Sequence, residues 1–295
     1  MAVAADHVVL RIDSPSDAEV FGNVLSAISG AGGEIVAVQT VTPGKDRVVR
    51  DVTAVGASAA DVAAAAAGVA SVSVVSSEAA SVREHDGGVL TMRNTAGVAT
   101  RDDLSMAYTP GVARVCMAIH EDFEKAWEYT IKGNSLMVVS DGSDVVGLGD
   151  LGPLASLPAC EAVCAVLRQV GGVDAFPLPI DERDLDVAAG HITRMSSVFA
   201  GVHLTSMTLE RGQELAEKLG ELLDIPVLVE AQLPREAVAG LWKGTLAARA
   251  RAITPSMVAA ATELALGSKL LDESVAQRAA DAVATAARGD NVARR

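Results

Sequence analysis

The sequence predicts an α/β protein with two domains. The chain has 295 residues, about twice the usual length of a single domain. Apolar residues form 50% of it and charged residues 21%, a composition that supplies a packed core and argues against disorder. Short apolar runs bounded by glycine and proline alternate with amphipathic stretches along the chain, which indicates strands that alternate with helices.

Residues 1–80 follow the order strand, helix, strand, strand, helix, strand. The first segment, HVVLRID, alternates polar and apolar residues as a half-buried strand does. The helix after it places Val20, Leu25 and Ile28 on one face and stops at a glycine-rich turn. This order is that of the ferredoxin-like β-α-β-β-α-β unit. The predicted segments are residues 7–13, 16–29, 34–42, 47–55, 59–69 and 71–75.

The first strand and helix resemble those of an ACT domain, a small regulatory module that often binds amino acids at a dimer interface. The resemblance consists of the topology, the run Asp13-Ser14-Pro15 and the later run Gly32-Gly33-Glu34-Ile35. The family prefers a glycine after this proline, where the backbone approaches the ligand, and this chain has Ser16. A ligand-binding ACT-like domain over residues 1–80 and a ferredoxin-like dimerisation module without a ligand remain alternatives.

A second α/β domain is predicted over residues 101–240, after a linker over residues 81–100. Its strands are short apolar runs, and its helices begin at cap residues such as Thr208. Strands and helices that alternate in this way form a parallel sheet. C-terminal helices are expected over residues 241–295. The predicted strands are residues 136–140, 173–178 and 225–229, and the predicted helices include 157–170, with Pro158 at its start, and 268–288.

Composition excludes several classes of function. The formal net charge of −14 and an aromatic content of 3% disfavour binding to nucleic acid. No run of 20 residues is apolar enough to cross a bilayer, and the N-terminus lacks the basic and apolar regions of a signal peptide. Cys116, Cys160 and Cys164 form no disulfide framework and predict free thiols. We therefore expect a cytoplasmic protein without nucleic-acid or membrane partners.

Residues 147–152 match the pattern G-x-G-x-x-G after a predicted strand, which is typical of dinucleotide-binding loops. That fold also needs an acidic residue at the end of the next strand, about 20 residues further on. Asp174 lies near this distance, but we find no helix and strand that frame it. The glycine pattern alone therefore does not predict a cofactor.

Four longer motifs explain these glycines better, and together they resemble the malic enzymes. They stand in the family's order, and the similarity covers residues 100–236. The resemblance implies that the glycine run is a structural turn and that the nicotinamide cofactor binds mainly to a later Rossmann domain. Many bacterial members also carry an N-terminal ACT-like region. The motifs are residues 102–113 (DDLSMAYTPGVA), 129–134 (YTIKGN), 139–153 (VSDGSDVVGLGDLGP) and 172–177 (GVDAFP).

Malic enzymes oxidise malate with NAD(P) and decarboxylate the resulting oxaloacetate to pyruvate. In the family a lysine acts as the base toward the substrate hydroxyl, and a tyrosine protonates the enolate. Tyr108 matches the family tyrosine. The family lysine follows a Leu-Pro-x-x-Glu-Gly pattern, which residues 157–162 (LPACEA) match in part, and Val163 occupies its position. A valine cannot accept a proton, so the resemblance implies that the base is missing.

The three carboxylate ligands of the family's divalent metal are also replaced. Thr205 and Ser206 occupy the positions of a Glu-Asp pair, and Ala231 occupies that of a later aspartate. Mg²⁺ and Mn²⁺ prefer charged oxygen ligands, and Glu230 is one carboxylate alone. We therefore expect no metal. The histidines do not have metal-ligand spacing either and are interpreted as ordinary surface or core residues: His7, His85, His120, His191 and His203.

The cofactor domain is expected to be missing from within the chain. After the metal motif the family continues into its Rossmann domain, but here Glu236 is followed almost directly by Leu241. A single βαβ unit needs about 30 residues, so nothing of that size fits between them. Residues 241–246 and 249–257 resemble the end of the family's nucleotide domain. We expect no cofactor and no cofactor-binding residues.

These replacements favour a malic-enzyme-like protein without catalytic activity. Its role would be regulatory: to sense a small carboxylate or amino acid, or to associate with another subunit such as an active malic enzyme. Both resembled families usually self-associate, so a homo-oligomer, by default a homodimer, is expected. The alternative is an oxidoreductase of the malic enzyme type, with NAD(P) and Mg²⁺ or Mn²⁺, that borrows a cofactor domain from a partner.

Overall fold

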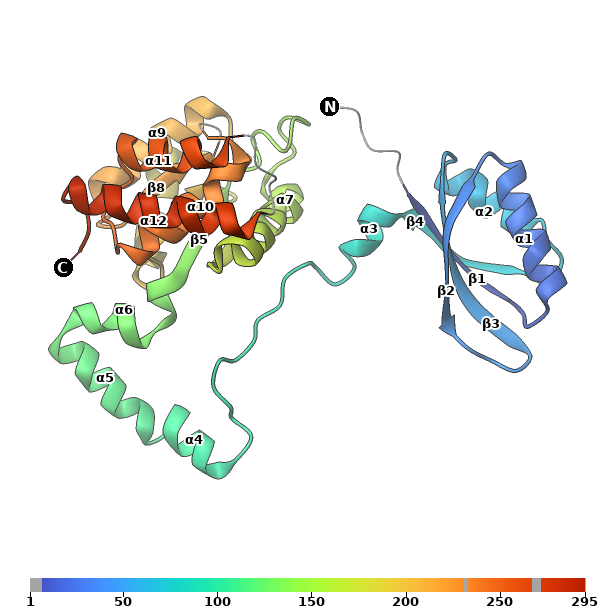
Figure 1. The fold of residues 1–295 in the computed structure, drawn as a ribbon, viewed down its shortest axis with the longest axis horizontal. Helices are drawn as coiled ribbons and strands as arrows, with labels where there is room; N and C mark the ends of the chain where they lie inside the picture. Colours follow the sequence, from blue (N-terminus) through green and yellow to red (C-terminus); the bar gives the residue numbers. More distant parts are fainter. Residues whose placement is uncertain (1–6, 231–232, 267–271, 295) are drawn as a thin grey trace. The chain divides into compact units, whose positions relative to one another are not determined.

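The computed structural model describes residues 7–230, 233–266 and 272–294. The chain divides into two compact units, Met1–Val89 and Leu90–Arg295. Each unit has its own cluster of buried apolar side chains and its own four-stranded sheet. The two units are therefore described separately (Figure 1).

The first unit has the order of elements that the sequence predicts. The elements are β1 (Val8–Pro15), α1 (Ala18–Gly30), β2 (Glu34–Thr42), β3 (Arg47–Val55), α2 (Ala59–Ala67) and β4 (Ser73–Ala79). The strand order is β2-β3-β1-β4, and all neighbouring strands are antiparallel. The predicted β-α-β-β-α-β order is thus confirmed. A short helix, α3 (Ala80–Glu84), follows β4.

The core of the first unit forms on one face of its sheet. Leu10 and Ile12 of β1 are fully buried, and Arg11 between them is partly exposed. This alternation continues along β1, as expected for a strand with one covered face. Val24 and Ile28 of α1 and Val62 of α2 are buried in the same cluster. Both helices therefore cover this face.

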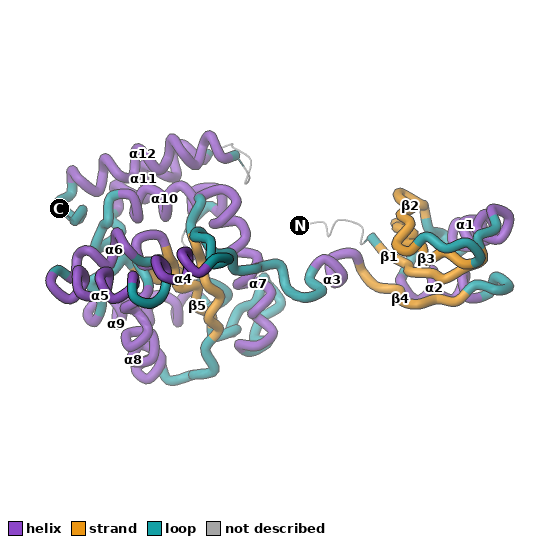
Figure 2. The backbone as a smooth tube through the Cα atoms, turned by 90° about the horizontal axis from the view of Figure 1, so that it is seen from below, coloured by secondary structure: helices purple, strands orange, loops and turns teal. Residues whose placement is uncertain are grey.

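The second unit contains a sheet of parallel strands, as predicted. Its elements are α4 (Arg101–Ala107), α5 (Gly111–Glu121), α6 (Ala126–Tyr129), β5 (Ser135–Ser140), α7 (Pro153–Val166), β6 (Asp174–Pro179), α8 (Leu185–Met195), β7 (Gly201–Leu204), α9 (Leu209–Leu222), β8 (Val227–Val229), α10 (Arg235–Ala247), α11 (Pro255–Ala265) and α12 (Glu273–Gly289). The strand order is β6-β5-β7-β8, and every pairing is parallel. Figure 2 shows these strands among the helices of the unit.

Helix α7 begins earlier than the sequence suggests. It starts at Pro153, and Pro158 lies inside it instead of at its start. With the π-helical turn Leu167–Gly171 it forms a run of 19 residues that is long and apolar enough, by length and composition, to cross a membrane. Cys160 and Cys164 are nevertheless buried in the core, and the helix contacts β5 and β6. This packing makes α7 a core helix of the second unit.

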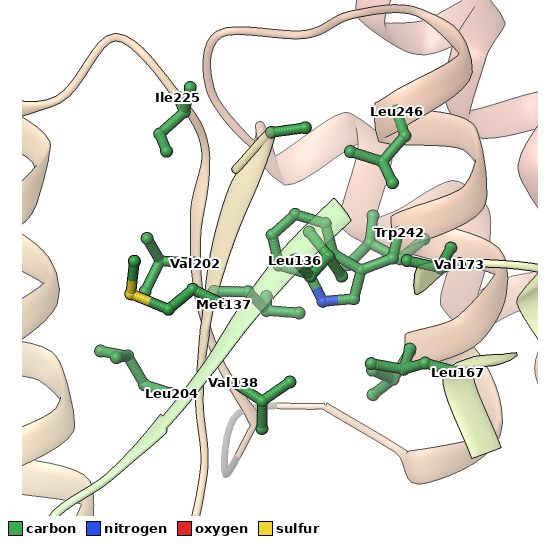
Figure 3. Packing of buried hydrophobic residues seen from close by; sticks show 14 of the residues in the cluster. Leu136, Met137, Val138, Leu167, Val173, Val202, Leu204, Ile225, Trp242 and Leu246 are labelled. Atoms are coloured by element: carbon green, nitrogen blue, oxygen red, sulfur yellow. The ribbon is translucent and has the colours of Figure 1, made fainter. Parts of the chain in front are cut away.

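Helices α10, α11 and α12 pack together, and their buried side chains, including Trp242, Met257 and Val283, belong to the same core. A Cβ atom on Gly201 would lie 2.5 Å from the Trp242 ring, and one on Gly244 would lie 2.4 Å from the backbone oxygen of Ala280. Figure 3 shows Trp242 next to Leu136. The helix predicted over residues 268–288 corresponds to α12, and residues 267–271 lie outside the described part of the chain.

Helices α4 and α5 contribute no buried residue. They contact each other, and Figure 1 shows them standing apart from the sheet of the second unit. Their large apolar side chains are therefore exposed. These side chains are Leu104, Met106, Tyr108, Val112, Val115 and Met117.

Candidate functional site

The candidate site lies at the carboxyl edge of the parallel sheet. The strand order β6-β5-β7-β8 means that the chain passes from β5 to β6 on one side and then crosses to β7 on the other. The connections after β5 and β7 therefore lead to opposite sides of the sheet, and open α/β sheets bind ligands at such a switch point. We call this edge of the sheet the carboxyl-edge crevice. Asp141 and Ser143 follow β5, Thr205 and Ser206 follow β7, and Glu230 follows β8.

Asp141 is a buried carboxylate in this crevice. It is 3% exposed, and its Oδ1 atom accepts hydrogen bonds from the backbone N–H and the hydroxyl of Ser143 at 3.0 and 2.6 Å. Its Oδ2 atom accepts from Nε of Arg211, on α9, at 2.6 Å. These bonds compensate for burial of the charge. The Arg211 side chain remains 27% exposed, so a positive group reaches the surface here.

A second ion pair lies at the rim of the crevice. Nη2 of Arg183 donates a hydrogen bond to Oδ1 of Asp150 at 2.8 Å. The backbone oxygen of Arg183 accepts a hydrogen bond from Nη2 of Arg211 at 3.2 Å. The hydrogen bond from Arg183 lowers the pKa of the Asp150 carboxyl. Arg183 and Arg211 are therefore linked, and both guanidinium groups lie close to the loop after β5.

The glycine run between β5 and α7 forms a tight loop. Gly147, Gly149 and Gly152 have positive φ angles, and a Cβ atom on Gly142 would lie 2.0 Å from the backbone oxygen of Gly152. The helix predicted over residues 157–170 and the strand predicted over residues 173–178 follow this loop as α7 and β6. Asp174, however, begins β6, and Arg168 and Asn134 donate hydrogen bonds to its carboxylate. It thus lies at the opposite edge of the sheet, away from the loop.

A chain of polar side chains connects α10 to the carboxyl edge. Nε1 of Trp242 donates to Nδ1 of His203 at 3.0 Å. A neutral His203 must then carry its proton on Nε2, which lies 3.6 Å from Oε2 of Glu230. The same carboxylate oxygen accepts a hydrogen bond from the hydroxyl of Thr205. Because His203 is fully buried, this chain fixes Glu230 against groups of the protein itself.

Ser206, next to Thr205, has a strained backbone. Its φ angle of 50° is in the left-handed region, which few residues other than glycine adopt. Its carbonyl oxygen accepts hydrogen bonds from the Ser140 hydroxyl and the Asp144 backbone N–H, both at 3.3 Å. These bonds hold the loops after β5 and β7 together. Strain of this kind gathers at functional sites.

Two of the three cysteines are buried beside the crevice. Cys160 and Cys164 lie one turn apart on α7 and are fully buried, whereas Cys116 is exposed. Burial raises the pKa of Cys160 to about 11 and that of Cys164 to about 12. All three are free, as predicted. The buried pair behaves as small apolar side chains without the reactivity of a thiolate.

Comparison with known proteins identifies the second unit. The N-terminal domain family of malic enzymes matches residues 90–218. An NAD-dependent malic enzyme from Geobacillus stearothermophilus is 38% identical over 232 residues, which cover 78% of this chain and 48% of that protein. This chain contains a malic enzyme N-terminal domain. A bifunctional malic/malolactic enzyme from Bacillus subtilis is 37% identical over 155 residues, which cover 52% of this chain and 38% of that protein.

Solved structures have the same fold as the malic enzyme domain. The malic enzyme from Pyrococcus horikoshii superposes with a TM-score of 0.66 over 70% of this chain and 88% of that chain, at 21% sequence identity. The NAD-dependent malic enzyme from Thermotoga maritima has a TM-score of 0.51 over 58% and 45% of the two chains, at 31% identity. The chain spans about half the length, or less, of the curated relatives that it matches.

The family positions singled out from the sequence lie in three different places. Thr205 and Ser206 are at the carboxyl edge, whereas Val163 is half-buried on α7 and packs against the core. Tyr108 ends α4, and its side chain is 70% exposed, on the part of the domain that stands apart from the sheet. Ala231 lies outside the described residues. The structure thus brings Thr205 and Ser206 to the crevice with Glu230, and Tyr108 does not join them.

Three residues of the site were not found from the sequence. His203 was interpreted as one of several ordinary histidines, and Arg211 and Trp242 were not singled out. The one sequence signal for His203 is its place two residues before Thr205, which the resemblance puts at the metal site. Trp242 is 39 residues away from His203, and no local pattern predicts their hydrogen bond.

Proposed function

We propose that this protein is a malic-enzyme-like protein without catalytic activity that acts in regulation. The observation that carries the proposal is the state of Glu230, the carboxylate that stands next to Ala231 and near Thr205. Thr205 donates to it, and the buried His203 faces it at 3.6 Å. Its Oε2 atom thus contacts the protein itself, and a single carboxylate supplies too few charged oxygens for a divalent metal.

The residues present do not fit a divalent cation. Mg²⁺ and Mn²⁺ need several hard oxygen ligands, with charge to offset their dehydration. Thr205 and Ser206 have only neutral hydroxyl groups, and Ser206 is held by its backbone bonds to the loop after β5. No group of three or more His, Cys, Asp or Glu side chains suited to a metal occurs among the described residues. The base is also missing, since Val163 has no titratable group.

The crevice retains groups that suit a small carboxylate. The partly exposed Arg211 and its neighbour Arg183 place guanidinium groups near the switch point of the sheet. Arginine recognises carboxylates through its paired N–H groups. A regulatory protein derived from a malic enzyme would use these groups to sense a small carboxylate without converting it. The proposal therefore assigns binding without chemistry to this crevice.

The first unit supports a regulatory role through its ACT-like character. Its β-α-β-β-α-β order is the order expected of that module, and two arginines of β3 donate hydrogen bonds to the end of β1. Nε of Arg47 donates to Asp13 at 2.9 Å, and Arg50 donates to the buried Ser14 at 3.1 Å. We propose an ACT-like sensing or dimerisation module here.

Self-association is the second part of the proposal. The apolar side chains on α4 and α5 are exposed, including Met106 at 78% and Tyr108 at 70%. Exposed apolar surface of this extent marks a site of protein association. A second copy of the chain, or a subunit of an active malic enzyme, would cover it. Tyr108 would then serve in that interface instead of as an acid.

Binding of Mn²⁺ distinguishes this proposal from the enzymatic alternative. Titration of the purified protein with Mn²⁺, followed by the loss of the free-ion electron paramagnetic resonance signal, should show no specific site, with or without malate. The double variant T205E/S206D restores two carboxylates and serves as the comparison, since it should bind Mn²⁺ more tightly than the parent. A stoichiometric Mn²⁺ site in the unaltered protein would contradict the proposal.

A further inference from the structure

A groove runs along the outer edge of strand β8, on the far side from β7. It has a volume of about 840 Å³, and β8, α9 and α11 form its walls. Its base is apolar, with Val227, Leu233 and Val258 among the lining residues. This volume is within the range of sites that hold ligands in proteins. The groove contains none of the Asp141, Thr205, Glu230 and Arg211 side chains of the candidate site.

The backbone of β8 is directed into this groove. Strand β8 ends the sheet, and among the described residues it pairs with β7 alone. The N–H of Val202, on β7, donates to the carbonyl of Pro226 at 2.9 Å, so Pro226 faces β7. Alternate residues of a strand face opposite neighbours, and Val227 and Val229 therefore direct their N–H and C=O groups away from β7. Both residues line the groove.

A strand edge whose backbone groups point away from the sheet, beside mostly apolar lining residues, favours an extended occupant. Unpaired N–H and C=O groups of a strand are satisfied best by another extended backbone. Side chains of an added strand alternate in direction, so every second one would face the apolar floor. A compact small molecule could not use the row of backbone groups in this way.

The charge of the residues that line the groove indicates which side chains a bound segment would carry. Glu217, on α9, is the one charged side chain among the residues that line the groove, and Gln213 lies one turn before it. The whole chain also carries a net charge of −14. Lysine or arginine is the side chain that complements a carboxylate at such a rim, and it also favours encounter with an acidic protein.

We propose that this groove binds an extended segment of a partner protein, which adds as a strand to β8. The segment would carry apolar residues at alternate positions and a lysine or arginine opposite Glu217. This interaction goes beyond the regulatory role proposed above and is independent of the carboxyl-edge crevice. It would give the protein a second place at which to contact a partner.

A peptide library tests the proposal directly. Phage that display random seven-residue peptides are selected on the full-length protein, and the enriched peptides are synthesised with a fluorescent label for anisotropy titrations. We expect enriched peptides to alternate apolar residues and to contain lysine or arginine. Their affinity should fall about tenfold in Glu217→Lys, because an attractive charge pair becomes repulsive. Glu214→Lys is the matched control, since Glu214 lies 3.7 Å from Lys218 on the same helix and does not line the groove.

A backbone variant separates strand addition from side-chain binding. Val227→Pro removes an N–H that is directed toward the groove while the pairing of Pro226 with β7 is kept. We expect it to weaken peptide binding at least as much as Glu217→Lys, with an unchanged circular dichroism spectrum. Failure to enrich any peptide, or equal affinity of the peptides for the parent, Glu217→Lys and correctly folded Val227→Pro, would overturn the proposal. A dimer of the parent that Val227→Pro dissociates would show a second copy as the occupant and would also overturn it.

Discussion

Trp242 reaches the carboxyl edge of the sheet through one side chain, His203. The indole N–H fixes the orientation of the imidazole, and the imidazole in turn faces Glu230. Polar groups that are buried this deeply need their partners, because an unpaired group retains the full cost of leaving water. The positions of Glu230 and Thr205 are therefore coupled to the packing of α10.

Removal of the indole N–H should destabilise the protein. In Trp242→Phe, Nδ1 of His203 loses its donor inside a fully buried site, and we expect a loss of about 1–3 kcal/mol in the free energy of unfolding, with part of it due to the smaller ring. Urea unfolding followed by circular dichroism measures this change. Met137→Leu, a buried substitution of similar volume, is the control and should cost less. Equal stability of Trp242→Phe and the parent would contradict the hydrogen-bond network.

Cys160 and Cys164 should not react with thiol reagents in the folded protein. With pKa values raised to about 11 and about 12, Cys160 and Cys164 stay protonated near neutral pH, and Cys116 alone is exposed. Ellman's reagent at about pH 8 should therefore react rapidly with one thiol in the folded protein, and with all three of the chain after unfolding. Rapid reaction of more than one thiol in the folded state would show that the α7 packing is wrong.

The same thiols predict a loss of stability in alkali. The pKa values of Cys160 and Cys164 in the folded protein exceed the ordinary value of 9.0. Below pH 9 both thiols are therefore protonated in the folded and in the unfolded protein, and their ionisation does not lower the free energy of unfolding. Above pH 9 the unfolded thiols ionise while the folded ones do not, and stability falls as pH rises toward about 11. The double variant Cys160→Ala/Cys164→Ala should lose less stability over this interval. An identical alkaline loss in the variant would contradict this assignment.

At the scale of elements, α10 and α12 depend on glycine for their close approach. A Cβ atom on Gly244 would lie 2.4 Å from the backbone oxygen of Ala280 and 2.6 Å from Cβ of Val283. Such contacts cannot be relieved by rotating a flexible side chain. The helices that end the chain therefore form a fixed cover for the sheet.

Alanine substitution tests this packing. Gly244→Ala should destabilise the protein by about 1–3 kcal/mol, because α10 and α12 must separate. Gly220→Ala, in α9, is the matched control: nothing lies within 4 Å of its added Cβ, and the change should stabilise the helix by up to about 1 kcal/mol. Denaturant midpoints of the two variants give the comparison. A neutral or stabilising Gly244→Ala would contradict the packing of α10 on α12.

The order of the elements was predictable because their patterns are local. The alternation in β1 and the apolar runs of β5 and β8 are visible in the sequence, whereas the strand β7 and the start of α7 were not predicted from it. Pro158 suggests a helix start, since proline is favoured in the first turn, but it lies in the second turn after Pro153. The coupling of His203 with Trp242 and of Asp141 with Arg211 joins distant segments, so neither followed from local pattern.

At the scale of the whole molecule, the described C-terminal helices share one core with the sheet of the malic enzyme domain. Helix α10 spans Arg235–Ala247, and thus no further domain enters the described chain between Glu236 and Leu241, as the sequence implies. The sheet and its glycine turn are present, and Val163, Thr205 and Ser206, which we propose replace the family's base and two of its metal ligands, have no charged side chains. Both features support binding without turnover.

Formation of NADH or NADPH from malate tests this account most directly. Highly purified protein with malate, Mn²⁺ and either NAD or NADP is followed by absorbance at 340 nm, beside an active malic enzyme as the positive control. The account predicts no turnover above the buffer blank at any protein concentration, and none after Val163→Lys alone, because the metal ligands remain absent. Turnover that rises in proportion to protein concentration and disappears with a metal chelator would contradict it.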